Sequence, residues 1–146
     1  QSLVQSPEIL TYVQREAHGR PVTLVNASSL VALVEDGSFL SRPDATQAEV
    51  CTFMTQLLRE QPGIDVCTLS STHLPWLIRY FEAATPSIQF LDPAQELVPQ
   101  LQAHVSEGSG SVVCLATASD ALPLDDLTKM LRLLGVNLQP NLISID

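Results

Sequence analysis

Residues 66–75 read Val66-Cys67-Thr68-Leu69-Ser70-Ser71-Thr72-His73-Leu74-Pro75, an apolar run that passes directly into a polar corner. Val66 and Leu69 supply the β-branched and apolar bulk of a buried strand, and the proline that follows is typical of a helix start. In an open α/β sheet, ligands bind at the carboxyl ends of the strands. The hydroxyls of residues 70–72 and the imidazole of His73 therefore predict a site here. The alternative is an ordinary strand-to-helix turn, in which serine and threonine cap the helix.

The rest of the chain alternates between short apolar strand patterns and amphipathic helix patterns. We expect strands at residues 22–25, 66–69, 88–91, 112–116 and 141–145. We expect a first helix that Ser6 caps and that ends before Gly19, and a second over residues 30–35 that Ser28 or Ser29 caps. Further helices are expected from residue 43 to the Pro62-Gly63 break, and over 75–84, 94–107 and 124–134. This alternation predicts an α/β fold with a parallel sheet flanked by helices.

Composition restricts the class of protein. The 146 residues are 45% hydrophobic and 16% charged, which is typical of one globular domain or slightly more. A formal net charge of −9, with only seven lysines and arginines, argues against a nucleic-acid partner. The longest apolar run is too short to span a membrane, so we expect no membrane partner.

Cofactor and metal signatures are missing from the sequence. It contains no phosphate-binding loop and no Gly-x-Gly-x-x-Gly fingerprint, so no cofactor is predicted. The three cysteines (Cys51, Cys67 and Cys114) are widely and irregularly spaced, which fits neither a disulfide framework nor a zinc site. We expect buried free thiols and a cytoplasmic location, with no metal site.

Four short runs, taken together, resemble one enzyme family in their order and spacing. They are Val4-Gln5-Ser6, Asn26-Ala27-Ser28-Ser29-Leu30-Val31-Ala32-Leu33-Val34-Glu35-Asp36-Gly37, Ser70-Ser71-Thr72-His73-Leu74-Pro75-Trp76-Leu77 and Phe90-Leu91-Asp92-Pro93-Ala94. The counterparts are Thr-Val-x-Ser, Ala-Cys-Pro-x-Leu-Val-Pro-Leu-Val-Glu-x-Gly, Gly-Cys-Thr-His-Tyr-Pro-Leu-Leu and a strand ending in Asp-Pro/Ser-Ala. These motifs belong to the second half of the cofactor-independent glutamate racemases, in the aspartate/glutamate racemase superfamily.

The resemblance implies both an architecture and an activity. Residues 1–93 would form the second α/β domain of a two-domain racemase, and residues 94–146 would return to pack on a first domain that this sequence does not contain. The implied activity is the interconversion of L- and D-glutamate for peptidoglycan synthesis, without a cofactor. The implied partner is a small amino acid, glutamate or aspartate.

The same resemblance assigns roles to individual residues. In the family, two cysteines flank the substrate α-carbon, and Ser71 stands where one of them belongs. His73 matches the histidine that assists proton transfer, and Glu35 matches a glutamate that points toward the site. Thr72, with Asn26 and Ser28, would bind the substrate. Glu35 also has a plainer interpretation, as one of two carboxylates at a solvated helix end, and Thr72 as a helix cap.

Activity is doubtful because a serine hydroxyl is a much poorer base than a thiol near neutral pH. We therefore expect this chain alone to be inactive as a racemase. One alternative is a non-catalytic racemase-like binding or interaction domain, and another is a plain α/β interaction domain of the response-regulator type. The segment after residue 94 should present an apolar face that favours self-association, for example as a homodimer. Its members are expected to be some of Leu97, Leu101, Val112, Val113, Leu127 and Leu131.

Overall fold

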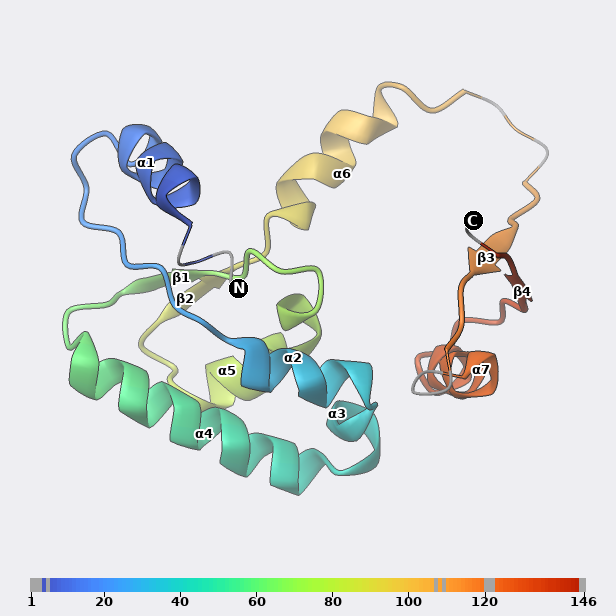
Figure 1. The fold of residues 1–146 in the computed structure, drawn as a ribbon, viewed down its shortest axis with the longest axis horizontal. Helices are drawn as coiled ribbons and strands as arrows, with labels where there is room; N and C mark the ends of the chain where they lie inside the picture. Colours follow the sequence, from blue (N-terminus) through green and yellow to red (C-terminus); the bar gives the residue numbers. More distant parts are fainter. Residues whose placement is uncertain (1–3, 5, 107, 109, 120–122, 145–146) are drawn as a thin grey trace.

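A computed structural model describes residues 4, 6–106, 108, 110–119 and 123–144 (Figure 1). Its helices are α1 (Pro7–Glu16), α2 (Ser28–Glu35), α3 (Ser38–Ser41), α4 (Pro43–Glu60), α5 (Ile78–Ala84), α6 (Ala94–Gln102) and α7 (Leu124–Leu133). A 3-10 turn, η2 (Leu74–Leu77), leads into α5. The strands are β1 (Val66–Thr68), β2 (Gln89–Leu91), β3 (Cys114–Ala116) and β4 (Pro140–Leu142). The chain is thus α/β, as the sequence predicts.

The strands form two small parallel sheets within the described residues, not one continuous sheet. β1 pairs with β2, with Val66 opposite Gln89, and β3 pairs with β4, with Cys114 opposite Pro140. Each pair is a strand–helix–strand unit: η2 and α5 connect β1 to β2, and α7 connects β3 to β4. The expectation of one sheet is therefore wrong in its extent, whereas the parallel pairing and the helical crossovers are confirmed.

The segment 22–25 accounts for part of this difference. It was expected to be a buried strand, but it has no strand structure, and Val22 is 55% exposed. The segment runs past β1 (Figure 1) and contacts the end of α4 through Thr23, whose hydroxyl lies 3.5 Å from the Gln61 side-chain oxygen. A β-branched composition favours a strand only where a ladder and packing partners exist.

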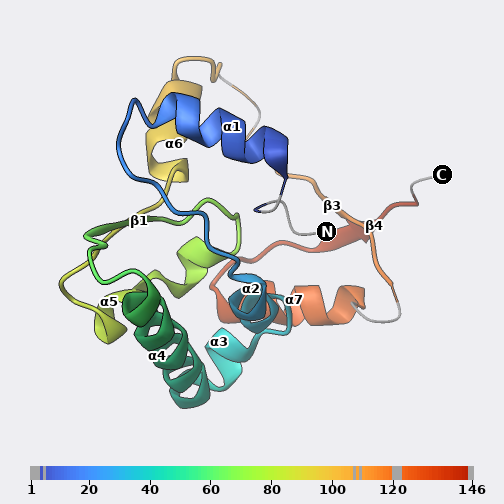
Figure 2. The same ribbon diagram turned by 60° about the vertical axis from the view of Figure 1, so that its left-hand side comes forward.

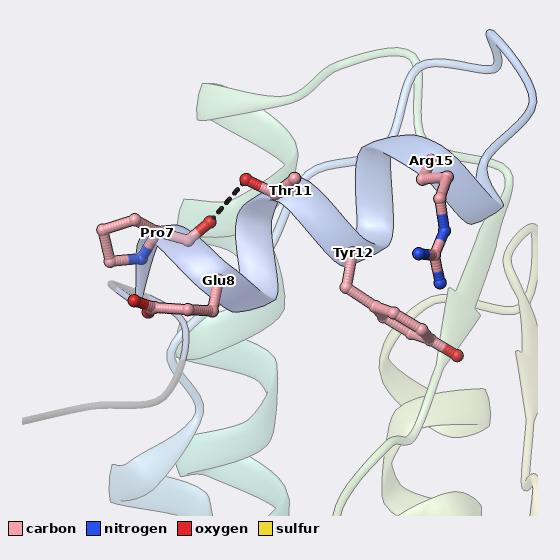
Figure 3. A pocket seen from close by; sticks show the side chains of 5 residues that line it. All are labelled: Pro7, Glu8, Thr11, Tyr12 and Arg15. Atoms are coloured by element: carbon pink, nitrogen blue, oxygen red, sulfur yellow. Dashed lines mark hydrogen bonds between the residues drawn. The ribbon is translucent and has the colours of Figure 1, made fainter.

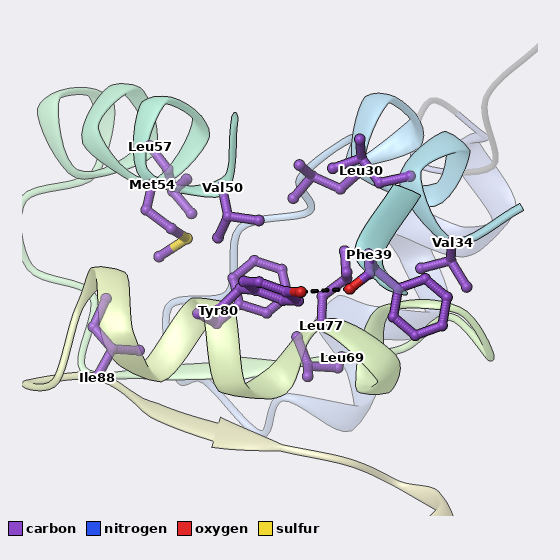
Figure 4. Packing of buried hydrophobic residues seen from close by; sticks show 12 residues of the cluster. Leu30, Val34, Phe39, Val50, Met54, Leu57, Leu69, Leu77, Tyr80 and Ile88 are labelled. Atoms are coloured by element: carbon purple, nitrogen blue, oxygen red, sulfur yellow. Dashed lines mark hydrogen bonds between the residues drawn. The ribbon is translucent and has the colours of Figure 1, made fainter. Parts of the chain in front are cut away.

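The main hydrophobic core lies between α2, α3, α4, η2, α5 and one face of β1–β2 (Figure 4). Leu30, Val50, Met54 and Leu77 are almost completely buried. Phe81 of α5 stacks on Phe90 of β2, with ring centroids 5.1 Å apart, which fixes the helix against the sheet. The Tyr80 hydroxyl donates a hydrogen bond to the Phe39 carbonyl and so joins α5 to α3.

The C-terminal segment extends from this core. α6 leads away from the end of β2, and the β3–α7–β4 unit follows (Figure 1). Leu97, Leu101, Val112 and Val113 are exposed, as expected. The other two candidate members, Leu127 and Leu131 on α7, are half-buried. Met130 of this helix and Leu134, directly after it, pack against the core.

Two element ends differ from expectation. α6 ends at Gln102, before the expected end at Glu107, which lies outside the described residues. β4 ends at Leu142, and the expected strand end at Ile145 also lies outside them. Within the described part of the chain, no helix has both the length and the apolar character needed to cross a bilayer.

Candidate functional site

The polar corner after β1 is built by the end of the sheet and the start of η2. The Leu69 amide still donates to the Leu91 carbonyl, at 2.8 Å, so the chain follows β2 for one residue beyond β1. It then turns, and the Ser71 hydroxyl oxygen accepts a hydrogen bond from the His73 backbone amide at 3.2 Å. The serine therefore stabilises the turn, but no side chain caps η2, so the helix-capping alternative for Ser71 and Thr72 is wrong.

Glu35 reaches this corner from α2, of which it is the last residue. Leu30, Leu33 and Val34 bury one side of α2, and the helix packs on η2. Gly37 ends the helix region with a left-handed backbone, at φ 72°. A carboxylate at a helix C-terminus is electrostatically unfavourable, by about 0.3–1 kcal/mol, unless a cation lies near it.

His73 occupies the position where such a cation would lie. Its Nε2 is 3.6 Å from Glu35 Oε1, and the contact is an ion pair when the imidazole is protonated. Its Nδ1 is 3.4 Å from the Ser71 hydroxyl and 3.4 Å from the Thr72 hydroxyl. One imidazole thus lies between a carboxylate and two hydroxyls. We call these four residues the His73 corner.

The His73 corner is open to solvent. The side chains of His73 and Glu35 are 37% and 50% exposed, respectively. The two hydroxyl contacts, at 3.4 Å, are long for hydrogen bonds, so a ligand with its own donors and acceptors can replace them without breaking a short bond. An imidazole with an acid on one nitrogen and hydroxyls on the other can accept, hold and pass on a proton.

The other two predicted site residues, Asn26 and Ser28, do not join this corner. The Asn26 side-chain oxygen accepts from the Ser28 amide at 3.1 Å and from the Ser28 hydroxyl at 2.6 Å. These bonds organise the start of α2, about 10 Å along the helix axis from Glu35. The expected serine cap of this helix is wrong, because Asn26 supplies the oxygen that accepts from its first amide.

Trp76 follows the His73 corner in the chain, and the sequence analysis did not select it as a site residue. It lies in η2, its amide donates to the His73 carbonyl at 3.1 Å, and its side chain is half exposed. Its ring packs at a tilt on Phe39, with centroids 6.2 Å apart. The sequence did contain a signal for this residue, since the only tryptophan of the chain lies within the motif of residues 70–77.

Two surface hollows lie elsewhere. One is lined by Pro7, Glu8, Thr11, Tyr12 and Arg15 (Figure 3), and the other by Cys51, Thr52, Thr55, Gln56 and Arg59. Each is lined by residues of a single helix, α1 or α4, so neither is enclosed by several elements. Ligand sites typically bury most of the ligand's surface, which a hollow on a single helix does not do.

Cys67 is the cysteine nearest to Ser71 in the chain. All three cysteines are free and half-buried. Cys67 packs against the core, as expected, and burial raises the pKa of its thiol. A raised pKa makes a thiolate scarcer, which is opposite to what a catalytic base requires. The described residues contain no group of three or more histidine, cysteine, aspartate or glutamate side chains able to hold a metal ion.

Comparison with known proteins gives no relative: no protein-family model, no curated protein and no solved structure matches the chain. The His73 corner must therefore be interpreted from its own chemistry and from the ordered motifs.

Proposed function

We propose that this chain is a glutamate racemase-like domain that binds glutamate or aspartate at the His73 corner but does not racemise it by itself. The observation that supports this most strongly is the position of His73, between the Glu35 carboxylate and the hydroxyls of Ser71 and Thr72. These residues come from two motifs 36 positions apart in the chain and meet at one strand end.

The arrangement suits a zwitterion. The Glu35 carboxylate can accept hydrogen bonds from the ammonium group, and the hydroxyls of Ser71 and Thr72 can donate to a carboxylate. His73 is then close enough to exchange a proton with the ligand. A net charge of −9 does not attract an anionic amino acid over long range, so recognition must come from these local groups.

Binding without turnover follows from Ser71. Removal of an amino-acid α-proton needs a strong, correctly placed base, and a serine hydroxyl does not provide one near neutral pH. In a complete enzyme, the same corner would serve one face of the α-carbon in the interconversion of L- and D-glutamate, which supplies peptidoglycan synthesis. A cytoplasmic location fits the free thiols.

Calorimetric titration tests this proposal. L-glutamate or L-aspartate should bind saturably to the natural chain and to His104→Ala, whose histidine is exposed and outside the corner. His73→Ala should weaken binding at least tenfold, or about 1.4 kcal/mol. Succinate, which lacks the ammonium group that Glu35 would recognise, should bind more weakly than aspartate. Equal binding by His73→Ala, or no binding by the natural chain, would contradict the proposal.

A second candidate is a non-catalytic interaction domain, which the exposed apolar side chains of α6 favour. This function requires no amino-acid ligand. A chain that binds neither glutamate nor aspartate, but forms a stable complex through α6, would favour it over the racemase-like proposal.

A further inference from the structure

Arg79, in α5, carries a charge that the described part of the chain does not neutralise. Its side chain is exposed and forms no ion pair with a described carboxylate, although the chain has 16 aspartates and glutamates. Arg15, Arg42 and Lys129, by contrast, each form an ion pair. The Arg79 guanidinium is therefore available to a carboxylate from outside.

This guanidinium is nevertheless held in place by the core. Its Nη2 donates to the Phe39 carbonyl at 3.3 Å and to the Tyr80 hydroxyl at 2.7 Å. The group also lies over the Tyr80 ring, with Cζ 4.6 Å from the ring centroid. Phe39 and Tyr80 are 3% and 4% exposed, so packing fixes both partners. A cation that is already ordered loses little conformational freedom when it binds a ligand.

The same guanidinium keeps unused donors. Arginine has five N–H groups, and the contacts with Phe39 and Tyr80 use those of Nη2 alone. The N–H groups of Nε and Nη1 have no hydrogen-bond partner among the described residues. Hydrogen bonds from a guanidinium to a carboxylate are about twice as strong as bonds between neutral groups.

Trp76 places an exposed aromatic ring near this charge. It precedes Arg79 by three residues in the continuous helical run of η2 and α5, so the two side chains leave the same side of the run. Both also contact Phe39 of α3, which lies against α2 and α4 (Figures 1 and 2). Trp76 is 50% exposed. We call Trp76 and Arg79, with Phe39 beneath them, the Trp76–Arg79 surface.

The charges indicate what this surface can bind. Tryptophan and arginine are the residues that most often dominate binding energy at protein interfaces. With a net charge of −9, the chain repels nucleic acid and strongly acidic partners over long range. A single carboxylate within about 8 Å of Arg79 still experiences the local positive charge at physiological salt. An apolar side chain next to that carboxylate would pack on the Trp76 ring.

We propose that the Trp76–Arg79 surface docks a peptide segment of another protein, in which a single aspartate or glutamate neighbours an aromatic or long aliphatic side chain. The carboxylate pairs with Arg79, and the apolar side chain packs on Trp76. The surface follows the His73 corner in the chain, but docking uses none of the four corner residues. It therefore does not depend on amino-acid binding.

Selection from a random peptide library displayed on phage, with the full natural chain as bait, tests this proposal. The recovered peptides should share one acidic residue next to an aromatic or long aliphatic residue. Trp76 is the only tryptophan of the chain, so its fluorescence reports the binding of a recovered peptide that lacks tryptophan. Replacing the acidic residue of that peptide with the matching amide should weaken binding about tenfold or more.

Variants of the chain locate the binding. Arg79→Met should weaken binding of the same peptide by about tenfold or more. Arg59→Met on α4, another exposed arginine without an ion pair to a described residue, is the matched control and should bind like the natural chain. His73→Ala should keep peptide binding, which separates this surface from the amino-acid site. Circular dichroism checks that each variant is folded, and the amide peptide tests the pairing without any variant.

Three results would overturn the proposal. The first is a library that yields no enriched peptide, or peptides without an acidic residue. The second is equal binding of the acidic peptide and its amide counterpart, or equal binding by the natural chain and a folded Arg79→Met. The third is a change in Trp76 fluorescence with inorganic phosphate or a short oligonucleotide but not with the peptides, which would assign the surface to another class of anion.

Discussion

At Ser71, a hydroxyl lies 3.4 Å from His73 Nδ1, where the proposed racemase-like function would require a thiol for catalysis. We predict that the chain exchanges no α-deuteron of L-glutamate from D₂O and produces no D-glutamate. Ser71→Cys should leave both rates at background, because the proposed two-base reaction also needs a second thiol, and no cysteine is assigned to the His73 corner. Loss of one general acid or base typically costs about 10²- to 10⁴-fold, and losing one of a coupled pair costs more.

Proton NMR of the α-position and circular dichroism of the glutamate measure these two rates in parallel. His73→Ala is the matched control for any residual exchange. Rapid racemisation by the natural chain would contradict the two-base interpretation and would make His73 the proton carrier.

Asp36 is a residue whose ionisation should affect stability. The Ser38 hydroxyl, together with the Ser38 amide and the nearby Arg42 charge, holds the pKa of Asp36 below its usual range, against an opposing effect of burial. A carboxylate with a lowered folded-state pKa stabilises the fold above the ordinary aspartate pKa. This stabilisation is lost as the pH falls through the folded-state value.

Asp36→Asn should therefore lower the free energy of unfolding at neutral pH, and the difference from the natural chain should shrink in acid. Urea unfolding at a series of pH values measures this change. Glu49→Gln, an exposed position in the middle of α4, should show no such trend. A deficit that stays constant down to strongly acidic pH would contradict the assignment.

At the scale of elements, the sequence predicted helices better than strands. The α1 start is confirmed in detail, since the Ser6 hydroxyl caps the helix by accepting from the Ile9 amide. The strand predicted at residues 22–25 is absent, because a strand needs a neighbouring strand for its hydrogen bonds and local sequence does not specify that neighbour. A helix satisfies its own backbone hydrogen bonds. α3 was missed because its four residues are too few to show a helical period.

The His73 corner was predictable to a similar degree. Motif order placed Glu35 and His73 in one site, and the structure brings them to 3.6 Å. Asn26 and Ser28 remained apart because a helix carries its two ends away from each other. Trp76 was missed because its exposure depends on how η2 packs, which no spacing rule specifies.

The packing of η2 supplies the prediction that belongs to this scale. Leu77 is completely buried beneath the corner. Leu77→Ala should lower the free energy of unfolding by about 2–5 kcal/mol, since it removes a buried side chain and leaves a cavity. Chemical denaturation measures this change, and Leu133→Ala, at an exposed position, should cost far less. Equal costs for the two variants would place η2 outside the core.

In the molecule as a whole, the elements of the main hydrophobic core are followed along the chain by α6 and then by the β3–α7–β4 unit. Large apolar side chains are exposed on several of these elements. A closed globular protein of this size would bury these side chains within itself. The polar corner and the apolar surface are separate features of the fold.

The most direct test of the central claim is a two-dimensional ¹H–¹⁵N spectrum of the chain during titration with L-glutamate. We predict that the amide signals of Glu35, Ser71, Thr72 and His73 move together and saturate along one binding curve, while the signal of His104 stays in place. Saturation without movement of these four signals, or movement confined to another part of the chain, would contradict the assignment of the His73 corner as the amino-acid site.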